Sequence, residues 1–264
     1  MGFYYKVDEA SKDSTLIGIF DEVLCYYANM RFIPANYSDI EFKIAGPTYQ
    51  FSQVDLKEAK SIWDEKISQN PHIFNGCAFS VLKCEKNNDK YLLTLCRVDY
   101  DKYLWNRESK KNLPGFAHLV VGIVVYQDGK VYLPIRGATT HFTGKLHTVS
   151  GGVDYQANIT SFGMHEYIKK VAFKEIQEEV VLSAPATVDD FDFWGMLYDP
   201  SVERSDMIFL LNRKIESITN WENSGLGVFT RDEFEKKLNE EPDSFLPTTK
   251  ALFPEILKED KIWK

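Results

Sequence analysis

Three glutamates lie close together in the second half of the chain, with a spacing that could hold a metal ion. Glu175, Glu178 and Glu179 occupy positions i, i+3 and i+4, so in a helix their side chains are neighbours on one side. Like charges at this spacing repel each other, and a divalent cation such as Mg²⁺, which prefers hard oxygen ligands, removes the repulsion. The same pattern is typical of a solvated acidic helix face, and the three glutamates alone do not separate the two interpretations.

The helix that would carry these glutamates is predicted near Glu166–Val181. On a helical wheel, Glu175 and Glu179 lie beside an apolar stripe rather than opposite it, and that stripe consists of Ala172, Phe173, Ile176 and Val180. Charges that are partly withdrawn from water repel each other more strongly. A cation would offset this repulsion, but the helix by itself leaves a solvated acidic face as an equally good interpretation.

The elements around this helix are predicted to form an α/β fold. Asp128-Gly129, between two β-rich runs at His118–Tyr126 and Val131–Ile135, is the strongest short signal for a hairpin. Further strands are expected near Leu146–Val149, Phe191–Tyr198, Met207–Asn212 and Leu226–Thr230, and two closing helices near Arg231–Leu238 and Thr248–Leu257. Helices flanking a mixed sheet imply an α/β/α sandwich.

The first half is predicted to be a smaller mixed α+β domain. The best boundary is Ser109–Gly115, which is polar and ends in Pro-Gly, so the predicted domains are residues 1–112 and 113–264. The expected elements of the first domain are helices at Asp21–Met30 and Asp55–Ser68 and a hairpin of Cys77–Cys84 with Tyr91–Val98.

Composition excludes several classes of protein. The chain has 264 residues, 44% of them hydrophobic, and a net charge of −8; this acidity argues against a nucleic-acid partner. Its four cysteines include no C-x-x-C pair, which indicates free thiols in a reducing compartment. Because neither a signal peptide nor an apolar run long enough to cross a bilayer is evident, we expect a cytoplasmic protein without a membrane partner.

The stretch Lys174–Leu182 resembles the second half of the Nudix box, R-E-U-x-E-E-x-G-U with U aliphatic, at five of its seven specified positions. Glu166 stands eight residues before Lys174, where the box has a glutamate, and Gly151-Gly152 stands after a strand, where the family has its Gly-Gly. The resemblance implies a Nudix fold for the second domain and hydrolysis of a nucleoside diphosphate linked to another group.

Three departures from the box concern its arginine, its glycine and its loop. Lys174 replaces the arginine and lacks the planar fork that binds a carboxylate through two donors. Val181 replaces the glycine, so the helix cannot end there in a left-handed conformation. The loop after Gly152 holds about eight extra residues, from Asp154 to about Ser161.

The layout of the whole chain is similar to one branch of the family, the UDP-glucose pyrophosphatases. The similar motifs are Ile62-Trp63-Asp64, Asn70–Gly76 and Ser150-Gly151-Gly152 with a long insertion after it. In that branch the box also lacks the arginine and the final glycine. The resemblance implies that UDP-glucose and water give UMP and glucose 1-phosphate, with Mg²⁺ as the cofactor and Mn²⁺ as its alternative.

The resemblance also assigns roles to individual residues. Glu175 and Glu179 would be the principal metal ligands, with Glu178 as a third that also serves catalysis, and Lys174 would hold a neighbouring carboxylate. Glu222, in the loop before the last strand, is the candidate general base, although an ordinary loop acid is an equal interpretation; Glu203 is second. The expected substrate contacts are Arg136 or Lys145 for phosphate, together with Gly151, Gly152 and Glu166.

Other functions stay open at this point. One is a Nudix hydrolase of another nucleoside diphosphate derivative, such as ADP-ribose, and another is a non-catalytic Nudix-like module that binds a nucleotide sugar. A transcription regulator is disfavoured because no basic DNA-reading region is evident. An isopentenyl diphosphate isomerase needs a catalytic cysteine, and no cysteine follows Cys96. The four histidines of the second half are interpreted mostly as structural or exposed, and no oligomeric state is predicted.

Overall fold

The structure, a computed structural model, describes residues 30–264 apart from 47–48, 72, 138–141, 200–203 and 220–221. The predicted helix Asp21–Met30 therefore lies, except for its last residue, outside the described residues. Within them, no helix combines the length and the apolar character needed to cross a bilayer.

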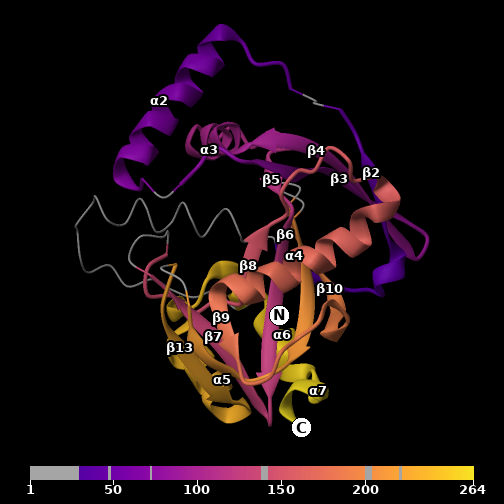
Figure 1. The fold of residues 1–264 in the computed structure, drawn as a ribbon, viewed down its shortest axis with the longest axis vertical. Coiled ribbons are helices and arrows are strands. Elements are labelled where there is room, and N and C mark those ends of the chain that lie inside the picture. The colour runs from indigo at the N-terminus through magenta and orange to yellow at the C-terminus, as the bar shows by residue number, and fades with distance from the viewer. Residues whose placement is uncertain (1–29, 47–48, 72, 138–141, 200–203, 220–221) are drawn as a thin grey trace, which may run out of the picture.

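A seven-stranded mixed sheet forms the centre of the molecule (Figure 1). Its path runs β1-β10-β11-β6-β7-β13, and β8 pairs with β6 beside this path. Only β11 and β6 are parallel among the paired strands of this sheet. The strands are β1 (Arg31–Pro34), β6 (Val120–Gln127), β7 (Lys130–Arg136), β8 (Val149–Gly152), β10 (Phe191–Asp199), β11 (Arg204–Asn212) and β13 (Asn223–Thr230).

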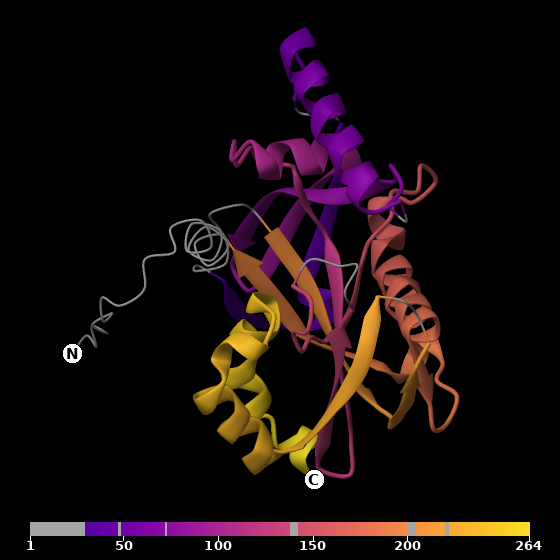
Figure 2. The ribbon, with the colours of Figure 1, turned by 90° about the vertical axis from the view of Figure 1, so that its left-hand side faces the viewer.

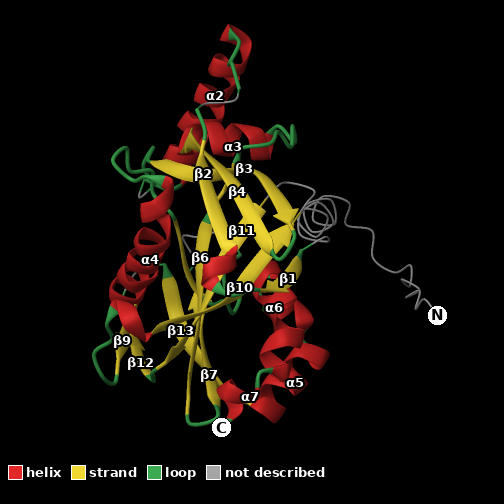
Figure 3. Ribbon diagram, turned by 90° about the vertical axis from the view of Figure 1, so that its right-hand side faces the viewer, coloured by secondary structure: helices red, strands yellow, loops and turns green. Residues whose placement is uncertain are grey.

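Helices cover both faces of this sheet, as Figures 2 and 3 show. α4 (Met164–Glu179) packs on one face, and α5 (Arg231–Glu240), α6 (Pro247–Lys258) and α7 (Asp260–Trp263) pack on the other. Side chains of β6 alternate between the faces: Val121 and Ile123 join the core under α4, whereas Val124 and Tyr126 join the core under α5 to α7. The predicted α/β/α sandwich is therefore confirmed.

A smaller four-stranded sheet lies above the central one, in the order β2-β4-β3-β5. It contains β2 (Ile40–Ile44), β3 (Cys77–Asn87), β4 (Lys90–Asp99) and β5 (Ala117–His118), and it is accompanied by α2 (Gln53–Gln69) and α3 (Tyr100–Glu108). The predicted hairpin and the predicted helix Asp55–Ser68 are both confirmed, and that helix ends before Asn70-Pro71 as expected.

The two sheets share one hydrophobic core. Phe79 and Leu93 of the small sheet belong to the same buried cluster as Val121 and Ile168 of the sandwich. In addition, β1 from the first half pairs with β10, and β5 from the second half pairs with β3. The division into residues 1–112 and 113–264 stays a prediction, and hydrogen bonds cross it in both directions.

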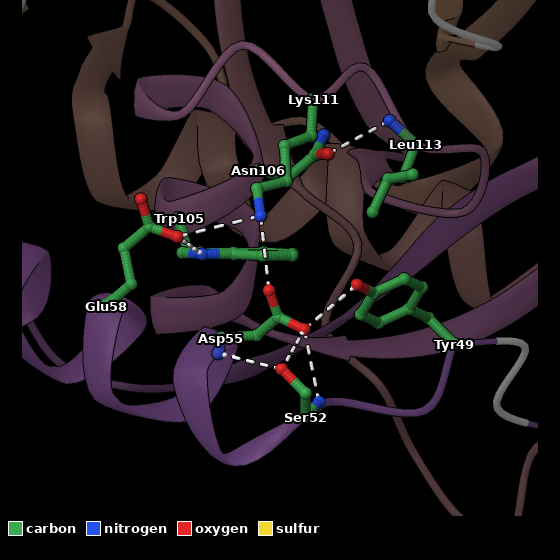
Figure 4. A network of polar contacts seen from close by, with 8 residues as sticks. All are labelled: Tyr49, Ser52, Asp55, Glu58, Trp105, Asn106, Lys111 and Leu113. Atoms are coloured by element: carbon green, nitrogen blue, oxygen red, sulfur yellow. Dashed lines mark hydrogen bonds and ion pairs between the residues drawn. The ribbon is translucent and has the colours of Figure 1, made fainter.

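A polar network fastens α2 to the segment after α3 (Figure 4). Ser52 and Asp55 form a capping box at the start of α2, and Lys111 Nζ donates to Asp55 Oδ1 at 3.1 Å. Trp105 of α3 donates from Nε1 to Glu58 Oε2 at 2.8 Å. Because aromatic rings pack around these bonds, α3 is held on one side by α2.

Turn chemistry explains the confirmed hairpin of the central sheet. Asp128 and Gly129, between β6 and β7, have φ values of 51° and 66°, the left-handed pair that a two-residue hairpin turn requires. The predicted strand His118–Tyr126 is nevertheless divided, because β5 ends at His118 and β6 begins at Val120.

Other strands were displaced or missed. The strand predicted at Leu146–Val149 is misplaced along the sequence. The observed strand β8 is Val149–Gly152, and Leu146 makes only isolated bridges. Gly151 and Gly152 have low intrinsic strand preference, but pairing with β6 holds them extended. Several short elements were not predicted: β1, β2, α3, β9 (Val180–Leu182), β12 (Ile215–Ile218) and α7.

Candidate active site

The acidic helix α4 ends earlier than the sequence predicts. It runs from Met164 to Glu179, and Val180 is extended, with φ −140° and ψ 154°, as the first residue of β9. The prediction that the helix reaches Val181, with Val180 in its apolar stripe, is therefore wrong. Val181 is 43% exposed and pairs with Ser217 of β12. Because the chain passes directly from helix to strand, no left-handed glycine is needed there.

Glu175 lies against the backbone of Gly151 in β8. A Cβ atom built on Gly151 would stand 2.0 Å from Glu175 Cδ and 2.3 Å from each carboxylate oxygen. Only a residue without a side chain allows this approach. A Cβ built on Gly152 would meet no atom within 4 Å. The contact with Glu175 therefore requires a glycine at position 151 but not at position 152.

Glu179, one helical turn further along α4, is only 2% exposed. Asn223, the first residue of β13, donates from Nδ2 to Glu179 Oε2 at 3.0 Å. Its Oδ1 lies 2.7 Å from His147 Nε2, and His147 Nδ1 lies 2.6 Å from the carbonyl oxygen of Thr148. A buried chain of hydrogen bonds therefore fixes the direction of the Glu179 carboxylate.

Burial makes both carboxylates reluctant to ionise. It raises the pKa of Glu175 to about 7 and the pKa of Glu179 to about 8, with the neighbouring acid Glu222 adding to each shift. A half-buried and a buried carboxylate that are costly to charge without a counterion suit a divalent cation, and Glu175 and Glu179 are the residues that would hold it. Among the described residues, no three His, Cys, Asp or Glu side chains already converge on one point, so water or substrate phosphate would complete the ligand set.

Arg136 and Glu222 lie beside the two carboxylates. Arg136, at the end of β7, donates from Nη1 to Glu222 Oε2 at 3.2 Å. The Nε of Arg136 is buried and has no hydrogen-bond partner within the described part of the chain. The charges of both residues act on Glu179. The structure thus brings Arg136, Glu175 and Glu222, three of the predicted residues, within electrostatic range of a fourth, Glu179.

Other predicted residues lie on the outer surface of α4. Lys174 and Glu178 form an ion pair at 3.5 Å with half of each side chain exposed. Glu178 therefore does not lie among the buried carboxylates, although its charge still raises the pKa of Glu175. Glu166 pairs with Lys170 at 2.6 Å and is mostly exposed. The substrate role of Glu166 and the metal role of Glu178 stay predictions.

Two further candidates are placed elsewhere or not at all. Lys145 donates from Nζ to the carbonyl oxygen of Asp243 at 2.6 Å, which holds it on the exposed surface. Glu203, the second candidate for the general base, lies outside the described residues.

Sequence reasoning missed Asn223 and His147. Asn223 directly follows the predicted base Glu222, but a single asparagine at a strand start carries no signal of its own. The sequence favours a structural role for His147, and only the fold shows that its ring contacts Asn223, which in turn binds the predicted metal ligand Glu179.

Comparison with known proteins gives similar folds at low identity. No protein-family model matches the chain, and no curated protein matches it. Among solved structures, Tm1382, named as a candidate Nudix hydrolase, is 15% identical with a TM-score of 0.43, over 74% of this chain and 95% of that one.

Two further solved structures are similar in the same range. A Nudix hydrolase from Nitrosomonas europaea is 16% identical with a TM-score of 0.39, over 55% of this chain and 72% of that one. The pyrophosphohydrolase BsRppH from Bacillus subtilis is 16% identical with a TM-score of 0.36, over 55% and 82%. At these identities and scores, the function of this chain has to be inferred from its own site.

Proposed function

We propose that the chain is a Nudix-type hydrolase that splits the diphosphate bond of a nucleoside diphosphate derivative with the help of Mg²⁺ or Mn²⁺. The observation that carries the proposal is the pair Glu175 and Glu179, two carboxylates withdrawn from water on one helix, with a glycine backbone in contact and an arginine alongside. An exposed acidic face, the alternative interpretation, would leave both side chains in solvent.

The bound cation would lower the pKa of an attacking water and neutralise charge on the phosphate oxygens. The residues of this chain would do the rest. Arg136 has a buried Nε–H without a partner among the described residues and can donate to a substrate phosphate. Arg136 at present binds Glu222. A phosphate that takes over Arg136 would release Glu222 to accept a proton from water, which is the role of a general base.

UDP-glucose is the substrate that we propose first, with UMP and glucose 1-phosphate as products. Support comes from the motifs outside the box, Ile62-Trp63-Asp64 and Asn70–Gly76, and from the two replaced box positions, Lys174 and Val181. The direct exit of α4 into β9 explains how the helix ends without the missing glycine.

The test is incubation of the purified full-length protein with Mg²⁺ and a panel of nucleoside diphosphate derivatives, with products separated by chromatography. UMP from UDP-glucose supports the first substrate, and AMP from ADP-ribose supports the alternative hydrolase. The Glu179→Gln variant, which removes a charge and little volume, should give no product while keeping the far-UV circular dichroism of the wild type. Absence of product from every compound would favour the binding module, and unchanged turnover in Glu179→Gln would contradict the assigned metal site.

A further inference from the structure

One side of α3 presents aromatic and basic side chains that the neighbouring elements cover only in part. Tyr100, Tyr103 and Arg107 are spaced i, i+3 and i+7 and so form one stripe, which we call the tyrosine face. Trp105 lies on the opposite side of the helix, fully buried beside α2. The three residues of the tyrosine face stay partly exposed.

The tyrosine face continues onto a histidine of the strand that joins the two sheets. The ring of His118 in β5 stacks on Tyr103, with ring centres 4.2 Å apart and planes inclined by 26°. The ring of Tyr100 lies 5.9 Å from His118 and 5.6 Å from Tyr103. Trp63 of α2 stands edge-on to Tyr100 at 6.2 Å. Four rings from three elements therefore adjoin one another.

His118 carries an unused hydrogen-bonding atom. Its Nε2 is inaccessible to solvent and has no partner among the described residues. Burial, followed by the charges of Arg204 and Arg107, lowers the pKa of His118 to about 3, so the imidazole is neutral and offers one donor and one acceptor nitrogen. A buried polar atom without a partner is costly unless a ligand or water reaches it.

The tyrosine face is close to the candidate active site. The charges of Glu222 and Arg136 both act on the hydroxyl of Tyr100, so this tyrosine lies within electrostatic range of the end of β7. The start of α3 is fixed from the Asn70–Gly76 motif: Tyr100 N donates to Gly76 O at 2.8 Å, and Asp101 N donates to Asn75 Oδ1 at 2.9 Å. This motif therefore sets where Tyr100 stands.

We propose that Tyr100 and Tyr103, with His118 stacked on Tyr103, bind the nucleobase of the substrate, while Arg136 binds its phosphate. The inference rests on the proposed function for the identity of the ligand. A base offers a planar π face for the partly exposed tyrosine rings, and stacking on aromatic side chains is the common way in which proteins bind single bases. The part of the molecule outside the sandwich would then supply recognition of the nucleoside.

Binding of reaction products tests this without turnover. Isothermal titration of the full-length protein with UMP, AMP, glucose 1-phosphate and ribose 5-phosphate compares ligands with and without a base. Tyr100→Ala and Tyr103→Ala should weaken the better-bound nucleotide on the order of tenfold, and leave the two base-free phosphates unchanged. The matched controls Tyr100→Phe and Tyr103→Phe keep the ring and should stay within about twofold of the wild type.

Emission of Trp63 gives a second readout that needs no alanine variant. The nucleotide should quench tryptophan fluorescence in the wild type and much less in Trp63→Phe, whereas glucose 1-phosphate should not quench it. Nucleotide binding that is unaffected by either alanine variant, or equal binding of base-free phosphates, would overturn the inference even if hydrolysis is found. Ring-dependent nucleotide binding without any hydrolysis would uphold it and contradict the proposed function instead.

Discussion

Gly151 and Gly152 adjoin in sequence but differ in what surrounds them. The Glu175 carboxylate occupies the space that a side chain at position 151 would need, whereas position 152 is open. Gly151→Ala should therefore displace Glu175 and lower kcat/KM with Mg²⁺ on the order of 100-fold, the scale of disturbed metal-site residues. Gly152→Ala is the matched control and should change kcat/KM less than about twofold. Equal losses in both variants would contradict the contact with Glu175.

Asn223 should matter for metal affinity although it is not a predicted ligand. Removing its amide in Asn223→Ala leaves Glu179 without its only described side-chain donor and interrupts the link to His147. The Mg²⁺ concentration for half-maximal activity should rise about 10- to 100-fold. Ser224→Ala, at the exposed neighbouring position, is the control. A similar Mg²⁺ requirement in both variants would remove the positioning role of Asn223.

Ionisation of the buried Glu179 should make the metal-free protein less stable as pH rises towards about 8, and the interval above about pH 7 isolates the last part of this loss. Glu179 has a pKa of about 8 in the folded chain, whereas a glutamate in an unfolded chain has a pKa of about 4.3. The folded state thus retains protons that the unfolded state has lost, and stability falls as pH rises towards the folded pKa. The pKa values of His118 and His147 are lowered, so in this range both histidines are largely neutral whether folded or unfolded.

Calorimetry in EDTA at about pH 7 and pH 8.5 measures this effect. The wild type should lose a few degrees of Tm, since about 1 kcal/mol corresponds to roughly 2–4 °C for a chain of this size. Glu179→Gln, which cannot ionise, should lose less. A wild-type Tm that falls no more than that of Glu179→Gln would show that the carboxylate is already charged at pH 7.

At the scale of elements, the exit of α4 predicts the effect of restoring the missing glycine. Val181 is in strand β9, where it pairs with Ser217, and glycine in a strand is unfavourable by roughly 0.5–1 kcal/mol relative to alanine. Val181→Gly should therefore lower the Tm by a few degrees and should not raise activity. Val181→Thr, which keeps a β-branched side chain, should be close to the wild type. A stabilising effect of the glycine would indicate that the helix end needs a left-handed residue after all.

Sequence patterns predicted those helices and turns whose conformation depends on neighbouring residues in the sequence. The period of Ala172, Phe173 and Ile176 predicts α4, and Asp128-Gly129 predicts its hairpin because the turn requires those residues. The helix end was mispredicted because pairing of β9 with β12 decides it, and β12 lies more than thirty residues further along the chain. Such pairing leaves no periodic trace in either short segment.

The candidate site was predictable to the same extent. Glu175 and Glu179 were identified because they share one helix, and Gly151 because it matches a motif. Asn223 and His147 are 44 and 76 residues away from the side chains they contact, and nothing in their own neighbourhoods marks them. Glu178 belongs to the same motif, but the turn of the helix places it towards solvent.

At the scale of the whole molecule, the shared core predicts cooperative unfolding. The cluster that includes Phe79 and Leu93 of the small sheet continues to Val121 and Ile168 of the sandwich. Neither sheet can lose its packing without exposing apolar surface of the other. Thermal unfolding followed by near-UV circular dichroism and by calorimetry should show one coincident transition. Two separated transitions would indicate that the predicted domains 1–112 and 113–264 unfold independently.

The segment that leads from the small sheet into the central sheet also affects which molecules can react. Leu119, between β5 and β6, donates to Phe79 O and accepts from Val153 N, at 2.8 and 2.9 Å, so the two sheets are joined by hydrogen bonds at the point nearest His118. The tyrosine face and the buried carboxylates then stand at a fixed separation. A base bound on that face, as proposed, would place one particular phosphorus beside Glu175 and Glu179. A compound with an additional phosphate between its base and the bond to be split would present a different bond to the metal site. The fixed distance between the two sites would therefore select substrates by the length of their phosphate chain.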